Sequence, residues 1–245
     1  MAEEKRFAKE REKIESFSDF SNVYNFKKDF KYSYKTDAGL TEEIVREISA
    51  QKDEPEWMLR ARLKSLELFY KIDYPTWGPD ISELQMDNIV TYVRPDAGLK
   101  ADWNEVPEDI KDTFDRLGIP EAEKTSLAGV GAQYDSEVVY HSIQEELVKQ
   151  GVVYTDFDTA LKEHEDIVRK HFMKLIPPTD HKFAALHGAV WSGGSFVYVP
   201  EGVQVDIPLQ SYFRLNAPGA GQFEHTMIIV EKGAKVHFIE GCSAP

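Results

Sequence analysis

A repeat near the C-terminal end constrains the fold more than any other feature of the chain. Residues 199–205 read Val-Pro-Glu-Gly-Val-Gln-Val, and residues 230–236, 31 positions later, read Val-Glu-Lys-Gly-Ala-Lys-Val. Both copies place a glycine-containing turn between two short runs of β-forming residues. Stacked units of this kind bury apolar faces that one unit cannot bury alone. The repeat therefore predicts the first turns of a right-handed parallel β-helix.

Helical patterns dominate the chain before this region. Thr41 is a predicted N-cap for a helix over residues 42–50, and Pro55 opens a second helix that runs to residue 71. One face of the second helix is expected to carry Leu59, Leu63, Leu66 and Tyr70. A last helix is predicted from about residue 158 to residue 175, ended by two prolines.

The period of the pattern changes from helical to strand-like after Lys182. The predicted class is therefore α+β, with a mostly helical region over residues 1–181 and the start of a β-helix over residues 182–245. Residues 129–132 (Gly-Val-Gly-Ala) are interpreted as a flexible joint. About three stacked units are usually needed for stability, so we expect a fragment or a short member of a longer family.

The composition excludes several classes of function. The 43 acidic and 29 basic residues give a net charge of −14, which argues against a nucleic-acid partner. One cysteine cannot form an internal disulfide, which favours a cytoplasmic protein. No apolar run approaches the roughly 18 residues of a membrane span, so no membrane partner is expected.

Four motifs in the strand-rich region resemble one known family. They are GSFVYVP at 194–200, YFRLN at 212–216, GQFE at 221–224 and EGCSAP at 240–245. Together they resemble the SufB/SufD family of iron–sulfur cluster assembly proteins. The resemblance implies a scaffold rather than an enzyme, with ATP hydrolysis supplied by a partner.

The same resemblance implies a set of partners and cofactors. The partners are a SufC-type ATPase, a SufD subunit or a second SufB-like copy, and a cysteine desulfurase or sulfur-transfer protein. The cofactors are a transient iron–sulfur cluster on the full complex and a reduced flavin. It also implies that the cluster ligands lie in the part of longer relatives that follows residue 245.

Cys242 is the first candidate for chemistry. A lone cysteine is often a small buried hydrophobic residue, and a reactive one needs thiolate character and exposure. Glu240 lies two residues away, on the same face of an extended strand, where its charge disfavours the thiolate. The resemblance implies that Cys242 accepts sulfur as a persulfide.

Arg214, Asn216 and Glu224 form a second candidate group. Arg214 and Asn216 share one face of a strand because they are two residues apart. Either both face solvent, or they line a polar passage with Glu224 as partner. The resemblance implies the passage, with Glu240, Arg214, Asn216 and Glu224 along the path of the sulfur.

Two other classes of function remain open. Glu224, His225 and His237 carry oxygen and nitrogen donors, so a cupin-like metal-binding enzyme is one alternative. A non-catalytic β-helix interaction module is the other. His164 and His171, seven residues apart on the last predicted helix, are interpreted as packing residues.

Overall fold

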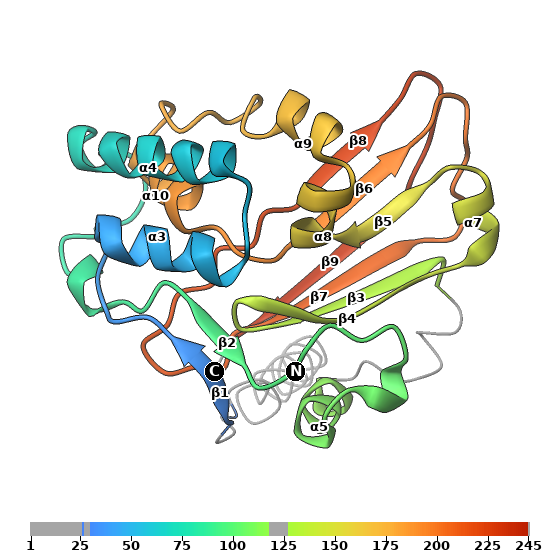
Figure 1. Ribbon diagram of the computed structural model, residues 1–245, viewed down its shortest axis with the longest axis horizontal. Helices are drawn as coiled ribbons and strands as arrows, with labels where there is room; N and C mark the ends of the chain where they lie inside the picture. Colours follow the sequence, from blue (N-terminus) through green and yellow to red (C-terminus); the bar gives the residue numbers. More distant parts are fainter. Residues whose placement is uncertain (1–25, 27–29, 118–126, 245) are drawn as a thin grey trace, which may run out of the picture.

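Three helices, α3 (Glu42–Gln51), α4 (Glu56–Lys71) and α10 (Lys182–Val190), gather at one end of the molecule, and two main sheets extend from that end (Figure 1). The structure is a computed structural model that describes Phe26, residues 30–117 and residues 127–244. The predicted α+β class is confirmed.

The first two helices begin where the sequence predicted. The Oγ1 atom of Thr41 accepts a hydrogen bond of 3.3 Å from the backbone N–H of Ile44, and Pro55 precedes α4. The buried face of α4 is rotated from the predicted one. Tyr70 is 63% exposed, whereas Arg62 is fully buried. Packing against α10 sets this rotation, because the Arg62 guanidinium donates to the Ala189 and Trp191 carbonyls.

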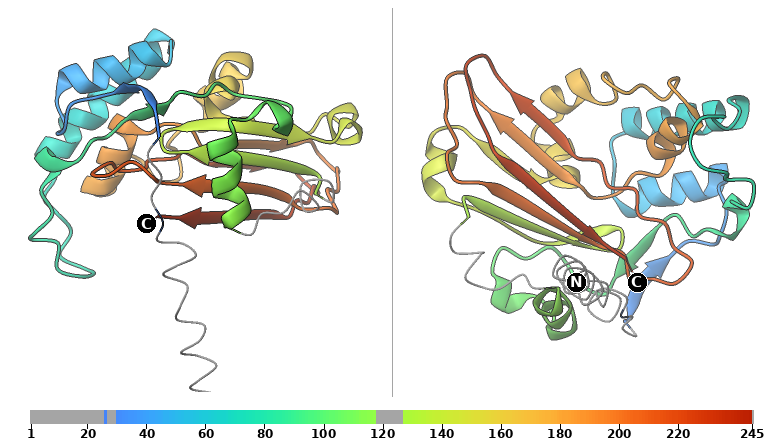
Figure 2. Two further views of the ribbon diagram at one scale, coloured as in Figure 1. Left: turned by 90° about the horizontal axis from the view of Figure 1, so that it is seen from below. Right: turned by 180° about the vertical axis from the view of Figure 1, so that it is seen from behind.

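The larger sheet has four strands. It is ordered β4-β3-β7-β9, comprising β3 (Gly129–Tyr134), β4 (Glu137–Ile143), β7 (Leu209–Arg214) and β9 (Phe238–Ser243). β3, β7 and β9 run parallel, and β4 is antiparallel to β3. Helix α5 (Glu108–Arg116) lies across one face of this sheet (Figure 2), where Phe114 packs with Val130 and Tyr134.

The smaller main sheet has three strands in the order β5-β6-β8. They are β5 (Val153–Asp156), β6 (Ser195–Val199) and β8 (Met227–Val230). β6 and β8 are parallel, and Val199 pairs with Val230, so the two copies of the repeat lie side by side in register. The antiparallel strands β4 and β5 each form one edge of their sheet, beside the parallel strands. The sheets are therefore mixed, and over the described residues they do not form a solenoid.

The remaining elements join these layers. They are the short antiparallel pair β1 (Tyr32–Lys35) and β2 (Val93–Pro95), the short helices α7 (Glu145–Lys149), α8 (Phe157–Glu163) and α9 (Glu165–His171), and the 3-10 helices η1 (Met86–Asn88) and η2 (Trp103–Glu105). The prediction of a single helix over 158–175 is wrong. The helix is interrupted at His164, whose ring stacks on Phe196, so α8 ends there and α9 begins. The strand-like pattern expected from Lys182 also begins later, since α10 comes first.

The flexible joint predicted at residues 129–132 is wrong, since these residues form the buried strand β3. Glycine is needed there for close packing. A Cβ atom on Gly129 would lie 2.5 Å from Cδ1 of Tyr154, and one on Gly131 would lie 2.9 Å from its hydroxyl oxygen. The glycines therefore let Tyr154 of one sheet approach the backbone of the other.

Both main sheets combine strands from before and after residue 182. β3 pairs with β7 in the larger sheet, and β5 pairs with β6 in the smaller one. The division at residue 182 stays a prediction. None of the helices in the described ranges has the length and apolar character needed to cross a membrane.

Candidate functional site

The two faces of the four-stranded sheet separate the predicted site residues. The register pairs Phe213 with Cys242 and Arg214 with Ser243. Neighbouring residues in a strand point to opposite faces, so Cys242 and Arg214 lie on different sides of the sheet. The side of Ser211 and Cys242 faces the smaller sheet, because the Ser211 hydroxyl lies 2.6 Å from that of Ser195.

Cys242 is exposed on β9, the outermost strand of its sheet in the described part of the chain. A hollow of about 140 Å³ reaches this part of β9 from the face that α5 covers. The lining residues are Phe114, Leu117, Tyr212, Phe213, Gly241, Cys242 and Ser243. Because the side chain of Cys242 is exposed, a reagent or partner can reach the thiol.

Two carboxylates influence this thiol. Burial raises the pKa of the Cys242 thiol, and the charges of Glu224 and Glu240 raise it further. Burial also raises the pKa of Glu224 and that of Glu240, and the Thr226 hydroxyl donates to Glu240 over 3.3 Å. The thiol is therefore protonated at neutral pH, and it needs added positive charge or a base to become a strong nucleophile.

Arg214 is fully buried on the opposite face. Its guanidinium carbon lies 4.6 Å from the centre of the Phe26 ring, which Arg116 also contacts at 3.9 Å. Arg214 also donates to the carbonyl of Phe26. These contacts tie Phe26 to α5 and β7, so Arg214 has a packing role in the described structure.

Asn216 is 1% exposed and follows β7. Its backbone N–H donates to Oδ1 of Asp135 over 2.6 Å, and Ala217 donates to the same oxygen over 2.9 Å. Asp135 lies in the β3–β4 turn with a φ of 53°. The structure thus brings Glu224 and Glu240 together with Cys242, and it places Arg214 and Asn216 elsewhere.

The space between the two sheets holds several buried polar groups. The Tyr154 hydroxyl lies 2.7 Å from that of Ser211, and the Gln133 side chain accepts from the N–H of Gly194 at 2.8 Å. A small void of about 10 Å³, about the space of one water molecule, is lined by Gln133, Gly194 and Ser211. The motifs did not single out Ser211 or Gln133, because buried small polar residues have no distinctive spacing.

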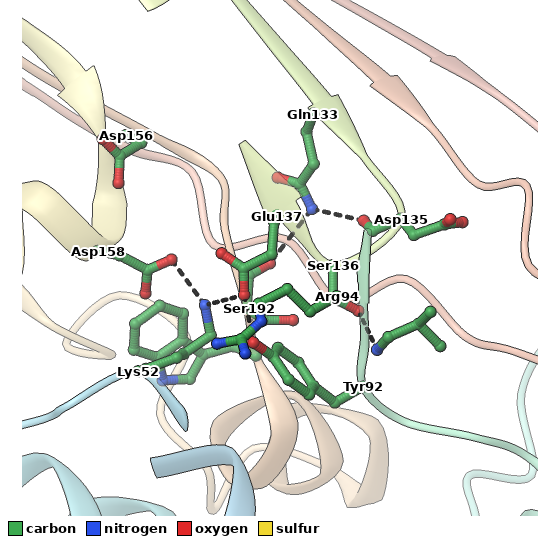
Figure 3. A network of polar contacts seen from close by, with 12 residues as sticks. Lys52, Tyr92, Arg94, Gln133, Asp135, Ser136, Glu137, Asp156, Asp158 and Ser192 are labelled. Carbon is green, nitrogen blue, oxygen red and sulfur yellow. Dashed lines mark hydrogen bonds and ion pairs between the residues drawn. The ribbon is translucent and has the colours of Figure 1, made fainter. Parts of the chain in front are cut away.

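A second polar cluster surrounds Lys52, at the C-terminal end of α3 (Figure 3). Its ammonium lies 2.7 Å from Asp158 and 3.2 Å from Glu137, and the Tyr92 hydroxyl donates to Glu137 over 2.5 Å. Burial opposes the charge of Lys52, but the charges of Asp158 and Glu137 leave its pKa raised. Sequence reasoning missed this cluster because Lys52 and Asp158 are 106 positions apart.

The histidines do not form the metal site considered above. Nε2 of His187 lies 2.7 Å from Nδ1 of His225, so the two rings share one proton between them. Burial lowers the pKa of His187 to about 4 and that of His225 to about 3. Within residues 30–117 and 127–244, no group of three or more His, Cys, Asp or Glu side chains is placed to hold a metal ion. The cupin-like alternative therefore has no ligand set there.

The fold and this site define a mixed-sheet α+β protein that carries one accessible thiol at a sheet edge. The family described as SufBD protein N-terminal region matches residues 41–211. The chain is 60% identical, over 212 residues, to the iron–sulfur cluster assembly protein SufB of Bacillus subtilis. It is 56% identical over 222 residues to an iron–sulfur cluster assembly SufBD family protein of Staphylococcus aureus.

These matches cover 86% and 91% of this chain, but 46% and 48% of the two relatives. The chain belongs to the SufB/SufD family, to whose N-terminal region it corresponds. It spans about half the length of the curated relatives it matches.

Proposed function

We propose that this chain is part of a scaffold for iron–sulfur cluster assembly, in which Cys242 accepts sulfur and passes it toward a nascent cluster. The observation that carries the proposal is the exposed thiol on β9, beside two carboxylates. Both relatives are named as iron–sulfur cluster assembly proteins, which supports the same general role here.

The transfer step is a thiol exchange. The Cys242 thiolate attacks the outer sulfur of a donor persulfide, a new S–S bond forms, and the S–S bond of the donor breaks. The donor leaves as a thiolate, so no external oxidant or reductant is needed. Burial, together with the charges of Glu224 and Glu240, keeps the thiol protonated until a partner arrives. A cationic group of that partner would favour the thiolate and be attracted by both carboxylates.

The path of the sulfur is also part of the proposal. Glu224 and Glu240 line its beginning, because both carboxylates act on the thiol. Arg214 lies on the other face of the sheet and Asn216 lies in the loop after β7, so we propose that they maintain the strand and the loop that shape this path. The polar groups between the sheets, including Ser211 and Gln133, offer an interior continuation.

We propose a complex of the SUF type around this chain. It comprises a SufC-type ATPase, a SufD subunit or a second SufB-like copy, and a cysteine desulfurase or its sulfur-transfer protein. ATP hydrolysis belongs to the ATPase partner. The reduced flavin and the cytoplasmic location stay predictions from the sequence.

We further propose that the parallel registers begin a right-handed parallel β-helix in the longer family members. Val199 pairs with Val230 and Leu209 pairs with Phe238, so successive copies of the repeat stack. β8 and β9 are the outermost strands in the described part of the chain, and each could pair with a following parallel strand.

Mass spectrometry after incubation with a cysteine desulfurase and free cysteine tests the function. We expect the mass of one sulfur atom to be added to Cys242 and to disappear with Cys242→Ser. A matched control combines Cys242→Ser with Ser243→Cys, which moves the thiol one residue along β9 to the other face. Equal labelling of that control, or no labelling of the natural chain, would contradict the proposal.

A further inference from the structure

A polar cavity lies away from Cys242, where four elements meet. It has a volume of about 260 Å³ and lies between the end of α3, the segment after β2, the start of β4 and the first turns of α8. The lining residues are Gln51, Lys52, Arg94, Ala97, Gly98, Leu99, Glu137, Val138, Asp156, Asp158, Thr159 and Lys162. This volume suits a small metabolite rather than a drug-sized ligand.

Carboxylates outnumber cations in the deep part of this cavity. Lys52, whose side chain is 3% exposed, is the buried cation there, and it is shared between Glu137 and Asp158. Asp156 adds a third carboxyl group. The second carboxylate oxygen of Asp158, Oδ1, is buried and has no hydrogen-bond partner among the described residues. A buried acceptor without a donor is costly, so this oxygen favours a ligand that brings an N–H group.

The remaining charged groups of the cavity are cations. Arg94 donates its Nε–H to Ser33 over 3.1 Å, and its other guanidinium nitrogens make no hydrogen bond or ion pair with the residues that the structure describes. Lys162 is 48% exposed and approaches Asp53 only at 3.8 Å. Both side chains can therefore turn toward an anionic group in the cavity.

We propose that this cavity binds a small zwitterion of the α-amino acid class, with its ammonium group at Asp158 and its carboxylate at Arg94 and Lys162. A simple anion fits less well, because Glu137 and Asp158 would repel it at depth. A metal ion fits less well, because the Lys52 ammonium already lies between the two carboxylates. The proposal is independent of sulfur acceptance, since no residue of the Cys242 site lines this cavity.

Calorimetric titration with glycine, L-alanine and L-serine tests this inference. We expect dissociation constants in about the millimolar range or tighter, as befits so small a ligand. Propionate lacks the ammonium group and L-alaninamide lacks the carboxylate, so each should bind at least about tenfold more weakly than L-alanine, a loss of about 1.4 kcal/mol. The absence of binding by all three amino acids at about 10 mM would overturn the proposal.

Variants of the lining residues test whether the ligand binds in this cavity. Arg94→Gln with Lys162→Gln should weaken L-alanine binding at least about tenfold, whereas Lys149→Gln, an exposed lysine on α7, should leave it unchanged. Asp158→Asn should weaken it too, and thermal unfolding shows whether that variant is folded. If Asp158→Asn does not fold, the double variant Arg94→Gln and Lys162→Gln tests whether the ligand binds in this cavity. Unchanged affinity in that pair would overturn the proposal, and Cys242→Ser should bind like the natural chain.

Discussion

The backbone N–H of Asn216 donates a 2.6 Å hydrogen bond to the buried carboxylate of Asp135. This contact joins the β3–β4 turn to the loop that follows β7, and the N–H of Ala217 shares the same oxygen. Burial raises the pKa of Asp135, although the two backbone donors oppose that shift. The carboxylate therefore organises the region from which Arg214 and Asn216 extend.

Replacing Asp135 should destabilise the protein strongly. Asp135→Ala leaves two buried N–H groups without an acceptor, and it puts alanine at a φ of 53°. We expect a loss of about 2–4 kcal/mol in the free energy of unfolding, measured with urea. Asp135→Asn keeps an acceptor oxygen and tolerates positive φ, so its loss should be clearly smaller. Equal losses would show that the hydrogen bonds are not the cause.

Lys52 should be essential to the packing of α3 against the sheets. Lys52→Met leaves Glu137 and Asp158 without their cation, so we expect a loss of about 3–5 kcal/mol in denaturant unfolding. Lys64 pairs with Glu67 on the exposed face of α4, and Lys64→Met should cost less than about 1 kcal/mol. A loss as small for Lys52→Met would mean that its ion pairs add little to stability.

Acid should weaken the fold through the paired histidines. His187 and His225 have pKa values of about 4 and about 3 in the folded chain, below the ordinary value of 6.5. The unfolded chain therefore binds more protons as the pH falls from about 6.5 to about 4, and stability decreases over that range. The slope should approach 1.4 kcal/mol per pH unit for each histidine.

The variant His225→Phe isolates this contribution. The buried carboxyl groups with raised pKa values, such as Asp135 and Glu224, act in the opposite direction in both proteins. The difference in unfolding free energy between the two chains should therefore change with pH, with the shallower acid slope in His225→Phe. Parallel pH profiles would show that His225 does not contribute.

Removing a carboxylate beside Cys242 should speed its alkylation. Glu240→Gln removes one of the two charges that raise the pKa of the thiol, so more thiolate should be present at about pH 8. The rate with iodoacetamide should rise several-fold, and its pH midpoint should fall. Glu231→Gln, at an exposed position in the turn after β8, is the matched control. Equal rates for the three chains would show that Glu240 does not act on the thiol.

The sequence determined the features that depend on local pattern. Thr41 caps α3 because a short hydroxyl side chain can reach the free N–H groups of the first turn. The repeat placed Val199 opposite Val230, because stacked units of equal length pair in register. The motifs around Cys242 also indicated the family, which is confirmed.

Only the tertiary structure decided which side chains meet. The strand pattern could not tell that Cys242 and Arg214 face opposite sides, because that depends on pairing β7 with β9 at residues 213 and 242. The glycines of β3 predicted a flexible joint, and only the fold shows that they make room for the side chain of Tyr154. The Lys52 cluster joins three segments that are distant in the sequence, through Glu137 and Asp158. A local sequence pattern cannot predict such contacts, because they form only when the segments pack together.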